Sequence, residues 1–206
     1  MQTQIIFPTL YLPSTQIFSQ IIKHDVLFLE SFEHYQKQSI RNRTTILTSN
    51  GIQTLTIPIK SNKSKLITEI EIANDQNWNA NHLKAIKSAY GKSAFFEFYF
   101  YQFEKIYLSN HKFLFSLNLD LMTLCLKLLK LKKQLIFTNT YNSIVSNSIY
   151  DGRKLFFETS FEENFFSKSD ILYYQLFGDE FVNNLSVIDL LFNEGTNALN
   201  YLYKIS

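Results

Sequence analysis

The N-terminal part of the chain shows two strand-like apolar runs separated by a helix-like pattern. Residues 4–12 are mostly apolar and predict a strand. Ser14 then supplies a side chain that favours the start of a helix. Apolar side chains recur after it at helical spacing: Ile17, Phe18, Ile21 and Ile22. An unbroken apolar run over 26–29 is typical of a buried parallel strand, so we predict a βαβ unit of the Rossmann-like kind.

The next segment carries the pattern of an antiparallel sheet. Two apolar-rich runs, 44–49 and 52–59, flank Asn50-Gly51, a dipeptide that strongly favours a tight hairpin turn. Residues 66–72 alternate between apolar and polar side chains, which predicts a third antiparallel strand. We therefore expect an antiparallel hairpin insertion after the βαβ unit.

The second half of the chain is largely helical in pattern. Helical periodicity runs through 78–90, 94–109 and 114–131, and residues 134–140 are expected to return to the sheet as a strand. The stretch 141–166 shows no clear pattern except a turn at Asp151-Gly152.

Two short helices are expected near the C-terminus. Ser186 and Asp189 form a variant capping box that opens the first, and Gly195 ends it. Thr196 caps the second. The predicted class is α/β (or α+β), with an N-terminal βαβ Rossmann-like unit, an antiparallel hairpin insertion and a largely helical second half, forming a single domain over 1–206.

Composition narrows the class of protein. The 206 residues are 46% hydrophobic and 18% charged, which suits one folded domain. A net charge of +2 argues against a nucleic-acid partner. No apolar run reaches the roughly 18 residues that a membrane span needs, and no signal-peptide pattern is present. With one cysteine and no cofactor-binding motif, we expect a cytoplasmic protein without a cofactor or a metal site.

Arginine is concentrated in one segment. Arg41, Arg43 and Arg153 are the only arginines, and two of them lie within 34–43. The guanidinium group matches the geometry of phosphate and carboxylate in a way that lysine cannot. Since 34–43 follows the second strand of the βαβ unit, it is expected at the edge of the sheet where ligands gather.

An extended conformation would make this segment an anion-binding strip. The two-residue period of a strand would then place Lys37, Ser39, Arg41 and Arg43 on one face. Lys37, Arg41 and Arg43 would hold a phosphate or carboxylate, and Asn42 would orient it. The alternative is a polar edge strand whose charges prevent aggregation.

Two further side chains are candidates for chemistry. Tyr11 ends the first predicted strand, where it either lines a pocket or covers the core. His82 lies one helical turn after Trp78. It is either a satisfied core histidine or a general base beside the arginine segment.

The order of motifs resembles that of a known family. The motifs are Tyr11-Leu12-Pro13-Ser14, Asp25, the segment 35–43, Asn50-Gly51, Ile57-Pro58, Asn77-Trp78, His82, Ala89-Tyr90, Phe95-Phe96-Glu97 and the segment 186–195. In this order they resemble the WbqC-like protein family across essentially the whole chain. Ile40, Gly91, Ala94 and Thr196 depart locally from the pattern. The resemblance implies a link to O-antigen and surface-polysaccharide gene clusters, and it carries over no catalytic residue.

Two functions are consistent with these observations. One is an enzyme of surface-polysaccharide assembly that transfers an acyl or aminoacyl group to a nucleotide-linked amino sugar. Its partner would be a small anionic ligand, either a sugar nucleotide or an acyl donor. The other is a non-catalytic binding or assembly module that docks to envelope or glycan-synthesis proteins.

Overall fold

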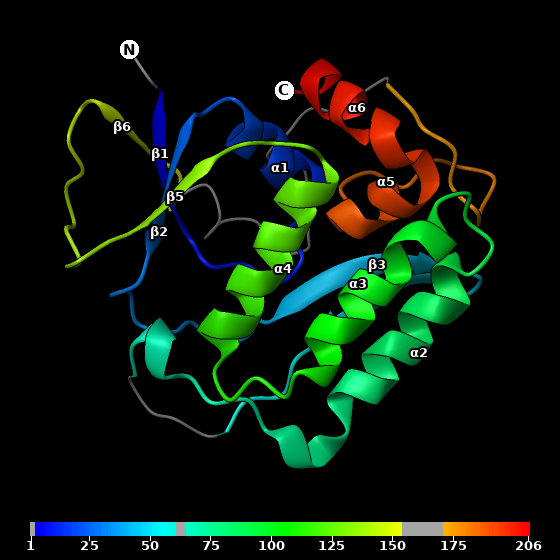
Figure 1. Cartoon of the computed structure of the whole chain (residues 1–206), viewed down its shortest axis with the longest axis horizontal. Helices are drawn as coiled ribbons and strands as arrows, with labels where there is room; N and C mark the ends of the chain where they lie inside the picture. Colours follow the sequence, from blue (N-terminus) through cyan, green and yellow to red (C-terminus); the bar gives the residue numbers. More distant parts are fainter. Residues whose placement is uncertain (1–2, 61–64, 154–170) are drawn as a thin grey trace.

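The computed structural model describes residues 3–60, 65–153 and 171–206 (Figure 1). Their strands are β1 (Gln4–Pro8), β2 (Val26–Glu30), β3 (Arg43–Thr48), β4 (Gly51–Thr56), β5 (Gln134–Phe137) and β6 (Ile149–Asp151). Their α-helices are α1 (Thr15–Ile22), α2 (Trp78–Tyr90), α3 (Phe96–Leu108), α4 (Leu114–Leu128), α5 (Val187–Glu194) and α6 (Ala198–Lys204). The predicted α/β class is confirmed.

A parallel sheet holds the N-terminal unit. Within the described ranges its strand order is β5-β2-β1-β6, and β1 pairs in parallel with both β2 and β6. The sequence β1–α1–β2 is therefore the predicted βαβ unit. The predicted return to the sheet after α4 is also confirmed, because β5 pairs in parallel with β2.

The two faces of this sheet have different surroundings. Ile5 and Phe7 of β1 and Leu27 and Leu29 of β2 are almost fully buried in the main hydrophobic core. Figure 1 shows the helices gathered on one side of the sheet. The alternation of a strand turns Ile6 to the opposite face. Helices thus cover one face of the sheet. The carboxyl ends of the strands and the second face of the sheet lie near the 139–149 connection.

The hairpin is confirmed, but the third antiparallel strand is not. β3 and β4 pair around Asn50-Gly51, where Gly51 has a φ of 94° that suits glycine. The segment expected as a strand over 66–72 instead forms a 3₁₀ turn, Ile67–Glu69, followed by single bridges. Its backbone bonds to several different segments, including Glu33, Lys60 and Lys112, so no single strand partner exists along its length.

The helical second half packs into the same core. α2, α3 and α4 match the predicted ranges to within three residues at each end. Ser186 caps α5 by accepting a bond from the Ile188 amide, as its position predicted. No helix in the described part of the chain is long and apolar enough to cross a membrane.

β6 is an element that sequence patterns did not reveal. It has only three residues, and it lies in the stretch 141–166 that showed no periodicity. Gly152 follows it and donates its amide to the Ile6 carbonyl at 2.9 Å. A Cβ at Gly152 would lie 3.0 Å from that same carbonyl oxygen, so the close approach favours glycine. The rest of that stretch, 154–166, lies outside the described residues.

Candidate functional site

The predicted anion-binding strip does not form as an extended face. Residues 37–42 form turns, with Gln38 at a φ of 54° and the Ser39 hydroxyl bonded to the Gln36 carbonyl at 2.8 Å. Only Arg43 belongs to a strand. Because the period of two is lost, Lys37 is exposed while Arg41 is fully buried. The segment therefore presents its basic side chains to different surroundings.

Arg41 points inward to a carboxylate. Its Nε donates to Glu33 Oε1 at 2.8 Å, and its Nη2 donates to Glu33 Oε2. The two hydrogen bonds make this a bidentate ion pair. Because both side chains are buried, the pair has little contact with solvent. Burial raises the pKa of Glu33 above its usual value, although the charge and hydrogen bonds of Arg41 act in the opposite direction.

The other predicted binding residues have separate partners. The Asn42 side-chain amide donates to the Ile57 carbonyl at 2.8 Å and so links the turn to the end of the hairpin. Arg43 lies close enough to Tyr35 to favour its ionised form. Burial nevertheless raises the pKa of Tyr35 to about 12. Asn42 is thus a structural link in this arrangement, and Arg43 lies near Tyr35.

Tyr11 and His82 meet in the core. The Tyr11 hydroxyl lies 2.8 Å from His82 Nδ1, and it also bonds to the Tyr107 hydroxyl. Trp78 packs against His82 edge-on, with ring centroids 5.3 Å apart. Burial lowers the pKa of His82 to about 4. The imidazole is therefore neutral at physiological pH, and its Nδ1 is hydrogen-bonded to the Tyr11 hydroxyl.

A second charged network occupies the carboxyl edge of the parallel sheet. Glu30, the last residue of β2, accepts a bond from Arg153 Nη1 at 3.0 Å and another from the Thr138 hydroxyl at 2.8 Å. Arg153 also donates hydrogen bonds from its Nε and Nη2 to the two carboxylate oxygens of Asp151 in β6, each at 2.9 Å. Three strands, β2, β5 and β6, thus deliver one connected polar cluster to the edge where α/β sheets bind ligands.

A cavity of about 280 Å³ opens at this edge. Its lining residues are Phe32, Glu33, His34, Gln36, Tyr141 and Arg153. The guanidinium of Arg153 lies over the Tyr141 ring, 5.0 Å from its centroid. The cavity therefore combines a carboxyl of raised pKa, an arginine, an imidazole and two partly exposed aromatic rings. This combination of a concave site with convergent polar groups makes it the candidate functional site.

The charge of this site is acidic overall. Arg153 bonds to both Glu30 and Asp151, so one positive charge faces two carboxylates. The positive charge of Arg41 is matched by Glu33. Such a balance suits hydroxyl and amine groups, which donate hydrogen bonds, better than a phosphate placed deep in the cavity.

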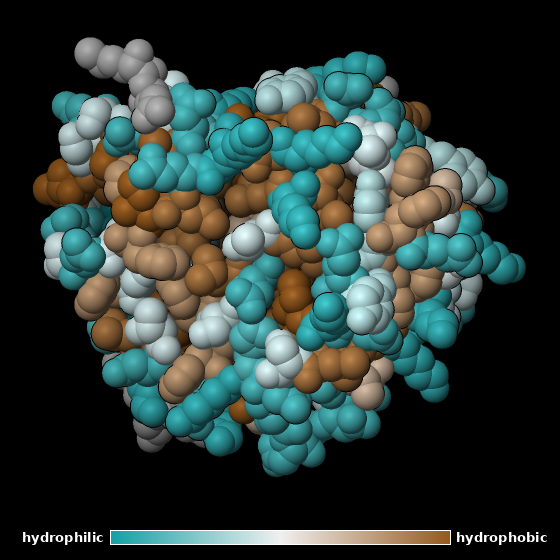
Figure 2. Space-filling view, in the orientation of Figure 1, coloured by the Kyte–Doolittle hydropathy of each residue, from teal (hydrophilic) through white to brown (hydrophobic). Residues whose placement is uncertain are grey.

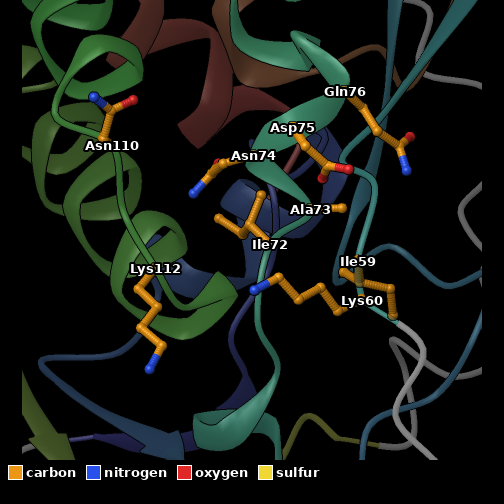
Figure 3. Close-up of a pocket in the computed structure, with 9 residues that line it drawn as sticks. All are labelled: Ile59, Lys60, Ile72, Ala73, Asn74, Asp75, Gln76, Asn110 and Lys112. Carbon is orange, nitrogen blue, oxygen red and sulfur yellow. The ribbon is translucent and has the colours of Figure 1, made fainter.

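A larger cavity elsewhere has less convergent chemistry. It measures about 660 Å³ and is lined by residues near 59–60, 72–76 and 110–112. Figure 3 shows Lys60 extending across it while Lys112 points away and Asp75 and Gln76 lie to the other side. Lys60 and Lys112 both form ion pairs with Glu71. Since its polar groups do not converge on one point, we keep the sheet-edge cavity as the candidate functional site.

In the described ranges, no group of three His, Cys, Asp or Glu side chains is placed to hold a metal ion.

Comparison with known proteins identifies relatives of the chain. The model of the WbqC-like protein family matches residues 9–201. The chain belongs to the WbqC-like protein family. A protein of Mycobacterium tuberculosis, described only as uncharacterized, is 26% identical over 217 aligned positions, which cover 93% of this chain and 94% of the mycobacterial protein. No solved structure matches the chain.

Sequence reasoning missed the most convergent groups of this WbqC-like protein. Glu30, Glu33 and Asp151 were not candidates, and Arg153 was noted only as the third arginine. One signal was available, because Glu30 is a charged residue that directly ends an unbroken apolar strand. Asp151 and Arg153 gave no such signal, because their strand has only three residues.

Proposed function

We propose that this WbqC-like protein is a cytoplasmic enzyme of surface-polysaccharide (O-antigen-type) biosynthesis. In this proposal it transfers an acyl or aminoacyl group to a nucleotide-linked amino sugar bound in the sheet-edge cavity. The observation that carries the proposal is the meeting of Glu33, Arg153 and Tyr141 in one cavity at the carboxyl edge of a parallel sheet. Family membership supports the biological setting.

Each lining group has a role in this proposal. The sugar ring packs against Tyr141 and Phe32, whose rings are partly exposed at the cavity. The carboxyl of Glu33 accepts the proton of the sugar amine as that amine attacks the acyl carbonyl. A raised pKa makes Glu33 a stronger base than an ordinary carboxylate. Arg41 is a positioning residue that fixes the orientation of Glu33.

The anionic part of the ligand is assigned to the rim. His34 and Gln36 line the cavity, and exposed Lys37 directly follows them. The nucleotide phosphates would lie along this rim, outside the acidic interior. His82 and Tyr11, which bond to each other in the core, take no direct part in the proposed transfer.

Binding of UDP-glucosamine, measured by isothermal titration calorimetry, tests the proposal. Tyr141 is half exposed, so Tyr141→Ala should leave the melting temperature almost unchanged. It should weaken binding by about five- to tenfold, because the aromatic contact is lost. Tyr174, also exposed, supplies a matched control, since Tyr174→Ala should bind normally. Equal affinity of wild type and Tyr141→Ala, or no binding of the nucleotide sugar, would contradict the proposal.

A second candidate function is a non-catalytic assembly module. Phe98, Tyr101 and Leu108 are exposed large apolar side chains that share one face of α3. Such a face is typical of a protein-binding surface. A Phe98→Glu substitution separates the two functions, because it would abolish partner binding by a module and leave ligand binding at the sheet edge intact.

A further inference from the structure

The face of the parallel sheet opposite the main core carries an ordered pattern of side chains. Ile6 of β1, Phe28 of β2 and Ile136 of β5 are in register, so their side chains lie in one row on this face. Two residues further along β2, Glu30 occupies the same face and holds Arg153. The face is therefore apolar along its middle and charged at its carboxyl end.

A separate cavity, of about 330 Å³, lies over the apolar row. Ile6, Phe28 and Ile136 form its floor, and Ile144, Val145 and Ile149 come from the connection between β5 and β6 and the start of β6. Figure 2 shows apolar surface among polar residues on the side of the molecule where Figure 1 places β5 and its connection to β6. The polar members of the lining are uncharged amides and hydroxyls, so the cavity offers a hydrocarbon group a site without a charged neighbour.

The apolar cavity and the candidate site share a wall. Thr140 and Asn142 line the apolar cavity, whereas Tyr141 between them lines the candidate site. Thr138 lines the apolar cavity as well, and its hydroxyl bonds to Glu30 of the charged network. A ligand with a polar reactive end and a hydrocarbon tail could thus reach both cavities across the segment 138–142.

We propose that the apolar cavity binds the hydrocarbon chain of the acyl donor, an acyl thioester, whose carbonyl reaches the candidate site. This inference rests on the proposed function and specifies its donor. The amine nitrogen of the sugar attacks the thioester carbonyl, a C–N bond forms and the C–S bond breaks. The sulfur leaves as a thiolate, and Glu33 takes the proton of the amine. A chain of several carbons is required, because an acetyl group would leave the apolar row in contact with water.

The chain-length dependence of binding tests this proposal on the full chain. Acetyl-, butyryl- and octanoyl-coenzyme A are titrated by calorimetry, each alone and with UDP-glucosamine. The affinity should rise from acetyl to octanoyl by as much as roughly fourfold for each methylene group that is buried. An affinity that does not change with chain length would overturn the proposal.

Variants of the cavity locate the binding. Ile136→Asn places an amide in the floor of the cavity, and it should make the affinity for the acyl-coenzyme A ligands nearly independent of their acyl chain length. Ser146→Phe fills the cavity from the connecting segment and should do the same without altering the sheet, which keeps the test valid if Ile136→Asn does not fold. Ile52→Asn, at an exposed position on β4, is the matched control and should retain the dependence. If the dependence persists in the folded Ser146→Phe protein, the proposed location is wrong.

The outcomes separate this inference from the proposed function. Binding of UDP-glucosamine without any preference for longer acyl chains would retain the sugar site and reject the acyl cavity. Chain-length dependence without binding of UDP-glucosamine would retain the acyl cavity and reject the sugar substrate. Binding of farnesyl phosphate in place of all three thioesters would show a hydrocarbon site of another class, and it would overturn the assignment to an acyl donor.

Discussion

The buried Glu33–Arg41 pair fixes the orientation of a carboxyl group at the wall of the candidate site. Arg41 donates to both carboxylate oxygens of Glu33, and Asn118 bonds to the Arg41 carbonyl. Glu33 in turn lines the candidate site. The guanidinium therefore holds the carboxyl in place within a poorly solvated environment, which is the arrangement that a fixed base requires.

Removing the arginine should be strongly destabilising. Arg41→Met would leave the Glu33 carboxyl buried without its counter-ion, and we expect a loss of about 3–5 kcal/mol in the free energy of unfolding at pH 7. Glu33→Gln combined with Arg41→Met should cost clearly less than the sum of the single changes. Urea denaturation measures both. Lys37→Met, at an exposed position of the same segment, should stay within about 0.5 kcal/mol of wild type. A small loss in the free energy of unfolding for Arg41→Met would contradict the assignment of a buried Glu33–Arg41 ion pair.

His82 should make stability depend on pH. Its pKa is lowered to about 4 in the folded protein from an ordinary value of 6.5, so between these values the unfolded chain binds a proton that the folded protein does not. Stability should therefore fall as the pH drops from 6.5 toward 4, by about 3 kcal/mol from this residue. The stability gap between wild type and His82→Gln should narrow accordingly from pH 7 to pH 4.5. A gap that is constant over this range would show that His82 is not a buried neutral imidazole.

At the scale of elements, the join between α5 and α3 depends on a glycine. Gly195 follows α5 at a φ of 55°, and a Cβ there would lie 2.3 Å from the Phe95 ring. Phe95 directly precedes α3, and its amide bonds to the Phe192 carbonyl of α5. The residue that ends α5 therefore also sets how closely α3 approaches that helix.

Gly195→Ala should be more damaging than a comparable change in the hairpin. Both Gly195 and Gly51 have positive φ values, so each alanine variant carries a backbone strain of about 1–3 kcal/mol. At Gly51 no atom lies within 4 Å of the added Cβ, whereas at Gly195 the Phe95 ring must move. Thermal denaturation should give a clearly larger loss for Gly195→Ala. Equal losses would mean that the contact with Phe95 relaxes at no cost.

At the scale of the whole molecule, the C-terminal helices complete the core begun by the N-terminal strands. Residues of α5 are fully buried in the same cluster as those of β1 and β2: Val187, Ile188, Leu190, Leu191 and Phe192. The Ser186 hydroxyl bonds to the Leu12 carbonyl at 3.0 Å, and Ser14 and Ser186 form a bridge. These contacts join the two ends of the chain and support a single folded unit.

Truncation tests whether the chain is one cooperative unit. A chain that ends at residue 185 lacks α5 and α6, and it should lose its cooperative thermal transition and its near-UV circular dichroism. A chain that ends at residue 203 loses only three residues after most of α6, and it should keep both signals. If the chain ending at 185 still unfolded cooperatively, the C-terminal helices would be a separate unit and the single-domain prediction would be wrong.

Local patterns were sufficient for elements whose own residues specify them. The β1–α1–β2 unit, the turn at Asn50-Gly51 and the three central helices were predicted, because strand runs, turn dipeptides and helical spacing are properties of neighbouring residues. Local patterns gave a wrong prediction for 66–72. Apolar and polar residues alternate there, but the backbone bonds to three separate segments instead of one partner strand. Local patterns also failed for β6, which is too short to show a period.

The sequence by itself determined the fold class, the family and the edge of the sheet where a ligand was expected. Only the tertiary structure decided which side chains face that edge. In the folded chain Arg41 points inward to Glu33, and His82 is buried against Tyr11. Arg153 bonds to Glu30, which precedes it by more than a hundred residues in the sequence. The physical reason is that the pairing of charges and burial depend on contacts between distant segments, which composition and spacing do not encode.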